Sequence, residues 1–138
     1  MARILIVDDE IAILRCFGLV LESAGHEVTT AISADDAKQK LMGQSFEVLI
    51  TDVRMETPTA GFEVLREARR NSPKMPVALL TAFPLPTAEW KQAGADALFQ
   101  KGGSIIKPMI EWVEAVLDAK KTAGDPSLEP HLAATLSS

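Results

Sequence analysis

Four short apolar runs of the sequence lead into residues that carry reactive polar groups. The first run leads to Asp8 and Asp9, a later one leads to Asp52, and the last two lead to Thr81 and Lys101. The set comprises three carboxylates, a hydroxyl group and an ammonium group. Like charges in contact repel by about 4 kcal/mol per pair at an effective dielectric constant of 20. Three carboxylates that meet in space therefore require a cation.

A divalent ion together with Lys101 would supply that positive charge. Carboxylate oxygens, water and a substrate phosphate are ligands that Mg²⁺ prefers, so Mg²⁺ is the expected cofactor. A carboxylate can attack phosphorus and form an acyl phosphate when cations neutralise the transferring oxygens. We expect Asp52 to be this nucleophile, Thr81 to donate its hydroxyl hydrogen to one phosphoryl oxygen, and Lys101 to pair with another.

The elements that position these groups follow from the alternation of apolar runs with segments of helical periodicity. The expected strands cover residues 4–7, 26–30, 46–51, 77–80 and 97–100. Strands that alternate with helices predict an α/β, doubly wound fold, in which helices cover both faces of one parallel sheet. The carboxyl ends of such strands share one edge of the sheet, and ligands bind there. Groups that are distant in sequence would meet at that edge.

Capping and helix-stopping residues predict where the helices begin and end. A first helix over 10–24 should bury Ile11, Leu14, Phe17 and Leu21, with Cys16 as a small core residue, and should stop at Gly25. The other expected boundaries are Ser33 and Gly43 for the second helix, Gly61 and a stop before Pro73 for the third, Thr87 and Gly94 for the fourth, and Pro108 and Gly124 for the fifth.

Length and composition favour one globular domain over 1–121, followed by a flexible tail over 122–138. The chain has 138 residues, of which 47% are hydrophobic, and its net charge is -5. The acidic balance argues against a nucleic-acid partner. A single cysteine excludes a disulfide framework, and the first apolar run is too short for a signal peptide or membrane span. We expect a cytoplasmic protein without a membrane partner.

Two alternatives concern the tail. Pro126 and Pro130 interrupt regular structure there, which favours a frayed terminus. Leu128, Leu132 and Leu136 could instead form a docking peptide.

Four motifs occur in a characteristic order. They are ILIVDDE at 4–10, FEVLITDVRM at 46–55, MPVALLTAF at 75–83 and AGADALFQK at 93–101. This ordered set resembles the receiver domain of two-component response regulators, in its stand-alone, CheY-like form. The resemblance runs from Arg3 to about Lys121. It implies a flavodoxin-like (βα)5 sandwich whose five parallel strands have the order 2-1-3-4-5.

The resemblance also implies roles for individual residues. Asp52 would be the phosphoacceptor, and its donor would be a phosphohistidine on a sensor histidine kinase or a histidine phosphotransfer protein. Asp9 and Asp52 would ligate Mg²⁺ directly, Asp8 would do so through water, and the backbone carbonyl of Arg54 would supply another ligand. The domain would assist its own phosphorylation and dephosphorylation without being a conventional enzyme.

The implied output is a change of protein binding. Thr81 and Lys101 would bind the phosphoryl group and relay its presence to the face formed by the fourth helix, the fifth strand and the fifth helix. A downstream protein would bind that face, and a homodimer is compatible with the resemblance. The equilibrium between two arrangements of the face would exist before phosphorylation.

The sequence departs from the family pattern after Lys101. Gly102 and Gly103 stand where the family usually has a proline with a cis bond, so a trans or remodelled loop is expected. Lys107 is followed by proline, but it comes too late to end the fifth strand. The usual aromatic switch position holds Leu98, with Phe99 beside it.

Other departures surround Asp52 and Thr81. The loop after Asp52 is about one residue longer than usual, and Glu56 within it could change metal affinity. The stretch after Thr81 is short and contains two prolines, so the fourth helix should be short or irregular. Arg54 and Phe83 stand at positions that influence the lifetime of the acyl phosphate in the family, and their bulk predicts slow self-dephosphorylation.

Two other functions remain open at this stage. One is a receiver-like scaffold that works without phosphate, suggested by the altered loops. The other is an aspartate-nucleophile phosphohydrolase that uses Asp8 with Glu10, although the usual second acid is aspartate. His26 and His131 are isolated, and we interpret both as ordinary surface residues rather than phosphodonors. A flavin site is not indicated, because no phosphate-binding loop follows the first strand.

Overall fold

A computed structural model describes residues 2–102 and 104–123. It confirms a single sheet of five parallel strands in the order β2-β1-β3-β4-β5. The strands are β1 (Arg3–Val7), β2 (Glu27–Ala31), β3 (Val48–Asp52), β4 (Val77–Thr81) and β5 (Ala97–Gln100). All five carboxyl ends therefore lie at one edge of the sheet.

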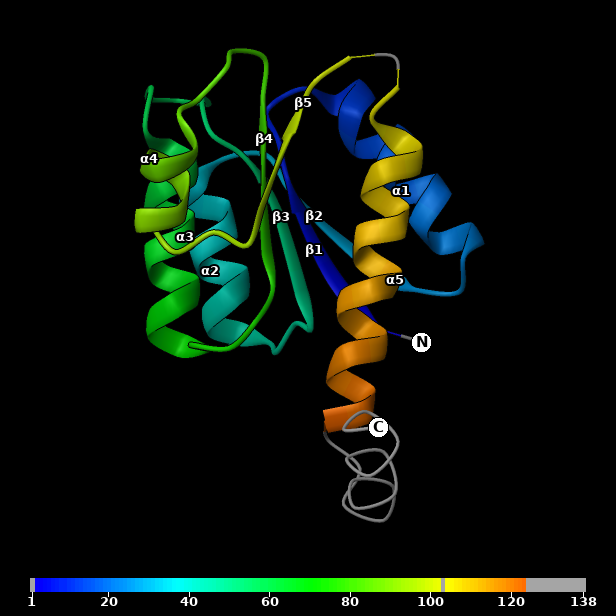
Figure 1. The fold of residues 1–138 in the computed structure, drawn as a ribbon. Coiled ribbons are helices and arrows are strands. Elements are labelled where there is room, and N and C mark those ends of the chain that lie inside the picture. Colours follow the sequence, from blue (N-terminus) through cyan, green and yellow to red (C-terminus); the bar gives the residue numbers. More distant parts are fainter. Residues whose placement is uncertain (1, 103, 124–138) are drawn as a thin grey trace.

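Helices cover both faces of this sheet. They are α1 (Ile11–Ser23), α2 (Ala34–Gly43), α3 (Ala60–Asn71), α4 (Thr87–Gln92) and α5 (Ile106–Ala123). Figure 1 shows α1 and α5 on one face, and α2, α3 and α4 on the other. Every residue of β3 and β4 is buried, as expected for strands covered on both sides.

Alternate strand residues serve two separate hydrophobic cores. In β1, Leu5 and Val7 pack with α2 and α3, whereas Ile4 and Ile6 pack with α1 and α5. All four side chains are fully buried. The period of two along each strand thus explains why a continuous apolar run feeds both sides of the sheet.

Several predicted helix boundaries are confirmed. Gly25 and Gly94 have positive φ angles of 95° and 101°, which suit glycine after a helix. Ser33 Oγ accepts a hydrogen bond of 3.1 Å from the Asp36 N–H. The prediction for Thr87 is wrong, because Thr87 is already helical and Pro86 occupies the capping position without a side-chain hydrogen bond.

The predicted buried face of α1 is partly wrong. Leu14, Phe17 and Leu21 are buried, but Ile11 is 59% exposed and Cys16 is also exposed. The helix lies over β1 and the edge strand β2, so only a narrow stripe of α1 contacts the sheet. The helical period correctly predicts which residues face the sheet. It cannot show that the sheet does not extend far enough to cover Ile11.

The interpretation of His26 as a surface residue is wrong. Its side chain is 7% exposed, and Nδ1 accepts a hydrogen bond of 3.3 Å from the Ala2 N–H. The proton is thereby placed on Nε2, which donates to Glu114 Oε1 at 3.0 Å. His26 therefore connects the start of the sheet to α5.

The last described helix carries Pro108 in its first turn, as predicted. It continues to Ala123, so residues 122 and 123, which the sequence analysis places in the tail, are helical. Residues 124–138 lie outside the described part of the chain, and with them lie the predicted helix end at Gly124, the tail leucines and His131. No helix among the described residues has the length and apolar character of a membrane span.

Candidate functional site

The strand ends bring four of the predicted residues to one edge of the sheet. Asp52 ends β3, Thr81 ends β4, and Asp8 and Lys101 directly follow β1 and β5. The ladder of backbone hydrogen bonds continues past the strands, because Lys101 N–H donates to Thr81 O at 2.7 Å. Hydrogen bonding between the strands therefore positions the backbone from which these side chains extend.

The ammonium group of Lys101 lies among three carboxylates. Its Nζ atom is 2.9 Å from Asp8 Oδ2, 3.1 Å from Asp52 Oδ2 and 3.1 Å from Glu10 Oε1. Asp8 and Asp52 are buried, whereas Glu10 is exposed. Sequence reasoning did not assign Glu10 a place beside Lys101. Its position directly after the aspartate pair was the available signal.

Burial and crowding perturb the proton affinities of these groups. Burial and the charge of Asp8 raise the pKa of Asp52 to about 6, although Lys101 partly offsets them. Burial also raises the pKa of Asp8. For Lys101, burial lowers the pKa, but the contacts with Asp8, Asp52 and Glu10 outweigh it and raise the pKa above its ordinary value. The site thus carries more negative charge than one ammonium group can neutralise.

The arrangement fits a hard divalent cation. One carboxylate oxygen from each of Asp8, Asp9 and Glu10 lies within 4.8 Å of the others. The buried Asp8 Oδ2 has no hydrogen bond, since its contact with Lys101 is an ion pair without hydrogen-bond geometry. An oxygen-only donor set whose negative charge exceeds that of the one ammonium group beside it suits Mg²⁺. The proposed ligand roles of Asp52 and of the Arg54 carbonyl remain predictions.

The hydroxyl group of Thr81 is engaged by the following loop. Thr81 Oγ1 donates to Phe83 O at 2.7 Å and accepts from Phe83 N–H at 3.0 Å. These bonds satisfy the buried hydroxyl group. If Thr81 binds a phosphoryl oxygen, as predicted, its bond to the Phe83 carbonyl must be exchanged.

Arg54 and Phe83 form a direct contact between the loops after β3 and β4. The guanidinium carbon of Arg54 lies 4.4 Å from the centre of the Phe83 ring, a cation–π distance. Phe83 is 52% exposed. The two positions predicted to shield Asp52 therefore interact with each other.

Gly61 allows α3 to approach the end of β3. Its N–H donates to Val53 O at 2.8 Å. A Cβ atom at this position would lie 2.1 Å from Asp52 O and 2.7 Å from Val53 Cα. Only glycine fits, so the absence of a side chain at Gly61 helps to place the backbone of Asp52.

Glu56 is bound to α2 rather than to the acidic cluster. Both of its carboxylate oxygens lie 3.0 Å from the Ala34 N–H, at the beginning of that helix. Slight burial raises its pKa, but the backbone hydrogen bonds outweigh this and lower it. The long loop after Asp52 is thereby attached to α2. Its effect on metal affinity remains a prediction.

The usual aromatic switch position before Lys101 holds Leu98, and its packing differs from that of the neighbouring Phe99. Leu98 packs with the core on the α2 and α3 side, whereas Phe99 packs on the other side against Trp112, with ring centres 6.1 Å apart. The described residues contain no cis peptide bond, which agrees with the expectation for Lys101 and Gly102.

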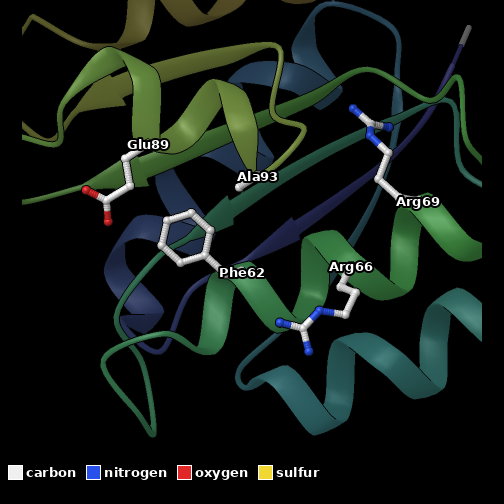
Figure 2. Close-up of a pocket in the computed structure, with 5 residues that line it drawn as sticks. All are labelled: Phe62, Arg66, Arg69, Glu89 and Ala93. Atoms are coloured by element: carbon white, nitrogen blue, oxygen red, sulfur yellow. The ribbon is translucent and has the colours of Figure 1, made fainter.

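A separate hollow of about 400 Å³ lies between α3 and the short α4. Figure 2 shows Phe62, Arg66 and Arg69 extending from α3, with Glu89 and Ala93 on the α4 side of the hollow. The guanidinium group of Arg69 already has partners within the chain, because it donates a hydrogen bond to Gly94 O at 2.6 Å and forms an ion pair with Asp96 at 2.9 Å. None of the strand-end residues lines this hollow.

The sequence matches the family profile of the response regulator receiver domain over residues 4–107. It is 43% identical over 95 residues to the alginate biosynthesis transcriptional regulatory protein AlgB of Pseudomonas aeruginosa, a match that covers 67% of this chain and 21% of that protein. It is 36% identical to the transcriptional regulatory protein GlrR of Escherichia coli over 59% of this chain and 18% of that protein. The match thus spans about a fifth of these relatives.

Solved structures show the same fold. A CheY-like response regulator receiver domain protein from Methanospirillum hungatei superposes with a TM-score of 0.81 at 29% identity, covering 90% of this chain and 99% of that one. The response regulator protein TrrA of Thermotoga maritima, solved in complex with Mg²⁺ and BeF, gives a TM-score of 0.75 at 28% identity over 84% of this chain and 99% of that one. This fold is therefore shared with solved chains of which it covers nearly the whole length.

Proposed function

Since this chain belongs to the response regulator receiver domain family, we propose that it is a signalling module in which Asp52 accepts a phosphoryl group. The observation that carries the proposal is the position of Asp52 at the end of β3, where its Oδ2 atom lies 3.1 Å from the ammonium group of Lys101. A nucleophilic carboxylate beside a fixed cation is the arrangement that attack on phosphorus requires.

The donor in this proposal is a phosphohistidine on a sensor kinase or a phosphotransfer protein. An oxygen of Asp52 attacks phosphorus, the bond between phosphorus and the histidine nitrogen breaks, and the nitrogen keeps the electron pair. The products are phospho-Asp52 and a histidine that takes up a proton. A cytoplasmic location would give the module access to such a donor.

The residues around Asp52 hold the transferring group. Asp8, Asp9 and Glu10 provide the oxygen cluster for Mg²⁺, with Asp52 and the Arg54 carbonyl as the remaining proposed ligands. When bound, Mg²⁺ would neutralise phosphoryl oxygens, as the Mg²⁺ complex of the TrrA relative suggests. Lys101 would pair with another phosphoryl oxygen, which loosens its contacts with the carboxylates.

Thr81 would connect the phosphoryl group to the output face. Its hydroxyl group exchanges Phe83 O for a phosphoryl oxygen, so the loop before α4 loses an anchor. The population then shifts between two arrangements of α4, β5 and α5, to which a downstream protein binds.

The test is intact mass after incubation with Mg²⁺ and acetyl phosphate, with Asp52→Asn as the matched variant. We expect a gain of one phosphoryl group in the parent alone. A gain in Asp52→Asn that is lost in Asp8→Asn would instead support the phosphohydrolase alternative. No gain in either chain, together with no binding of Mg²⁺ and beryllofluoride, would support the phosphate-independent scaffold.

A further inference from the structure

The loop between β3 and α3 is attached to the rest of the chain on both sides of Arg54. On the side of β3, the N–H and carbonyl groups of Val53 are both hydrogen-bonded, to β4 at 3.0 Å and to the first turn of α3 at 2.8 Å. On the other side, both carboxylate oxygens of Glu56 lie 3.0 Å from the Ala34 N–H. This loop is therefore held at two points.

The backbone of Arg54 lies between these two points. In the part of the chain that the structure describes, its N–H and carbonyl groups make no backbone–backbone hydrogen bond. Its side chain extends to the ring of Phe83. The direction of the Arg54 carbonyl, a proposed ligand of Mg²⁺, therefore depends on the attachments of its neighbours.

The start of α2 is a fixed point for Glu56. Ser33 Oγ accepts a hydrogen bond of 3.1 Å from the Asp36 N–H, and Asp36 Oδ2 accepts one of 3.1 Å from the Ile32 N–H. Reciprocal bonds of this kind close the turn before a helix, as in a capping box. Ala34 is buried in the hydrophobic core on the α2 and α3 side. The N–H group that Glu56 contacts is thus held from two directions.

The same turn also holds the loop that carries the acidic cluster. Asp8 N–H donates to Ala31 O at 3.1 Å, and Ala31 is the last residue of β2. Only two residues separate it from Ala34. We call residues 31–34 the β2–α2 turn. The backbone of Asp8 and the loop after β3 are therefore attached to one short segment.

We infer that Glu56 is a positioning residue for divalent cations, because it holds the Arg54 carbonyl in place relative to the carboxylates that follow β1. This role rests on the proposed function, in which that carbonyl and the acidic cluster bind Mg²⁺. Glu56 acts through the Ala34 N–H rather than as a ligand, since both of its carboxylate oxygens contact that group. Residues that orient the ligands of a metal commonly change its affinity by about 10–100-fold.

The choice of ion should depend on this contact. Mg²⁺ requires nearly ideal octahedral coordination, whereas Ca²⁺ accepts six to eight oxygens in flexible arrangements. A released loop would therefore weaken the binding of Mg²⁺ more than that of Ca²⁺. Loss of the Glu56 charge alone would weaken the binding of both ions to the same extent. The ratio of the two affinities thus separates positioning from electrostatics.

Isothermal titration calorimetry of the full chain, without a phosphodonor, would measure both dissociation constants. Glu56→Ala should raise the constant for Mg²⁺ by about tenfold and that for Ca²⁺ by about threefold or less. Glu56→Gln keeps an oxygen that can accept the Ala34 N–H, and salt screens the lost charge of this exposed residue. Both constants should therefore stay within about twofold of the parent.

A second variant removes the same contact from the other side. Ala34→Pro lacks the N–H group, and proline suits the first position of a helix. The preceding Ser33 is extended, with φ -157° and ψ 169°, as a residue before proline should be. Ala34→Pro should weaken Mg²⁺ binding as Glu56→Ala does, and the double variant should bind Mg²⁺ no more weakly than either single variant.

Glu89→Ala is the matched control. It removes an exposed carboxylate from α4 and should leave both dissociation constants unchanged. Circular dichroism would verify that each variant keeps the helical content of the parent.

Three outcomes would overturn this role of Glu56. They are unchanged constants in Glu56→Ala, equal increases for both ions in Glu56→Ala and Glu56→Gln, and a parent that binds neither ion. The proposed function is judged separately by the mass gained with acetyl phosphate. A parent that is phosphorylated on Asp52 but binds Mg²⁺ equally well without Glu56 would keep the proposed function and exclude the positioning role.

Discussion

Lys101 is a single cation in contact with three acids. Asp8, Glu10 and Asp52 each reach its Nζ atom, and they come from loops after β1 and from the end of β3. Burial, to which the neighbouring negative charge adds, raises the pKa of both buried aspartates. In a metal-free protein the site therefore destabilises the fold at neutral pH, and this cost can be measured.

Asp52→Asn should increase the free energy of unfolding in EDTA at neutral pH. Folding raises the pKa of Asp52 from 3.8 to about 6, so the folded state binds the proton more tightly and ionisation favours unfolding. Allowing for the lost contact with Lys101, the gain should be about 1–2 kcal/mol. It should shrink as the pH falls from about 6 towards 4, where the parent also becomes neutral.

Urea titrations of both chains across this pH range would measure the difference. Addition of Mg²⁺ should reduce the difference in the free energy of unfolding at neutral pH, because a bound cation stabilises the parent more than the variant. A variant that is less stable than the parent at neutral pH would contradict the assignment of charge crowding to Asp52.

The contact between Arg54 and Phe83 bears on the lifetime of phospho-Asp52. Removing either side chain should open the site to water and accelerate hydrolysis, by about three- to tenfold if the pair is worth roughly 1 kcal/mol. Arg54→Lys retains the charge and should have a smaller effect than Arg54→Ala. The measurement is the decay of the phosphorylated mass after the phosphodonor is removed. Equal lifetimes in the parent and in Arg54→Ala would contradict shielding by this pair.

At the scale of elements, the approach of α3 to β3 depends on Gly61. Gly61→Ala should lower the free energy of unfolding by about 2–4 kcal/mol, because its Cβ atom would overlap backbone atoms that cannot move independently. It should also slow the phosphorylation of Asp52, whose carbonyl oxygen is the first atom displaced. Urea unfolding and the rate of mass gain with acetyl phosphate would measure the two effects.

Gly43→Ala is the matched control. Nothing lies within 4 Å of a Cβ atom at Gly43, the last residue of α2, and its φ is not positive. We expect a change of at most about 0.5 kcal/mol there. A loss of stability of the same size at both positions would contradict close approach as the reason for glycine at Gly61.

The strand ends could be predicted because apolar runs and the residues that follow them are both local in sequence. Asp52, Thr81 and Lys101 stand where that pattern places them. The contact of Glu10 with Lys101 spans 91 residues and depends on how α1 begins, so no local pattern encodes it. The same holds for Glu56, whose partner Ala34 becomes available only after α2 and the loop have packed together.

Predictions about exposure failed where they depended on neighbours. Ile11 and Cys16 fit a helical period, but α1 lies at the margin of the sheet and contacts it along one stripe. His26 was misjudged in the opposite direction, since Glu114 closes over it from α5. The period of a helix gives the direction of each side chain, whereas burial depends on what the rest of the chain places there.

At the scale of the whole molecule, His26 connects the first and last elements. His26→Ala should lower the free energy of unfolding by about 2–3 kcal/mol, because the Ala2 N–H loses its acceptor and a buried volume becomes empty. Glu114→Gln keeps a hydrogen-bond acceptor and should cost less than about 1 kcal/mol. Urea unfolding would measure both, and amide exchange should show faster opening at the start of β1 in His26→Ala. Unchanged exchange there would contradict a connecting role for His26.

The ammonium group that completes the acidic cluster comes from the final strand of the sheet, and this has a consequence for biosynthesis. The ribosome adds Asp52 49 residues before Lys101. A nascent chain can therefore pair β1 with β3 before Lys101, whose ammonium group neutralises part of the carboxylate charge, has been synthesised. That charge arrives only when β5 has been made and inserted beside β4. Chains truncated before this point, by stalled translation or by proteolysis, cannot form the complete cluster. The cluster therefore forms only after β5 has been synthesised and has paired with β4.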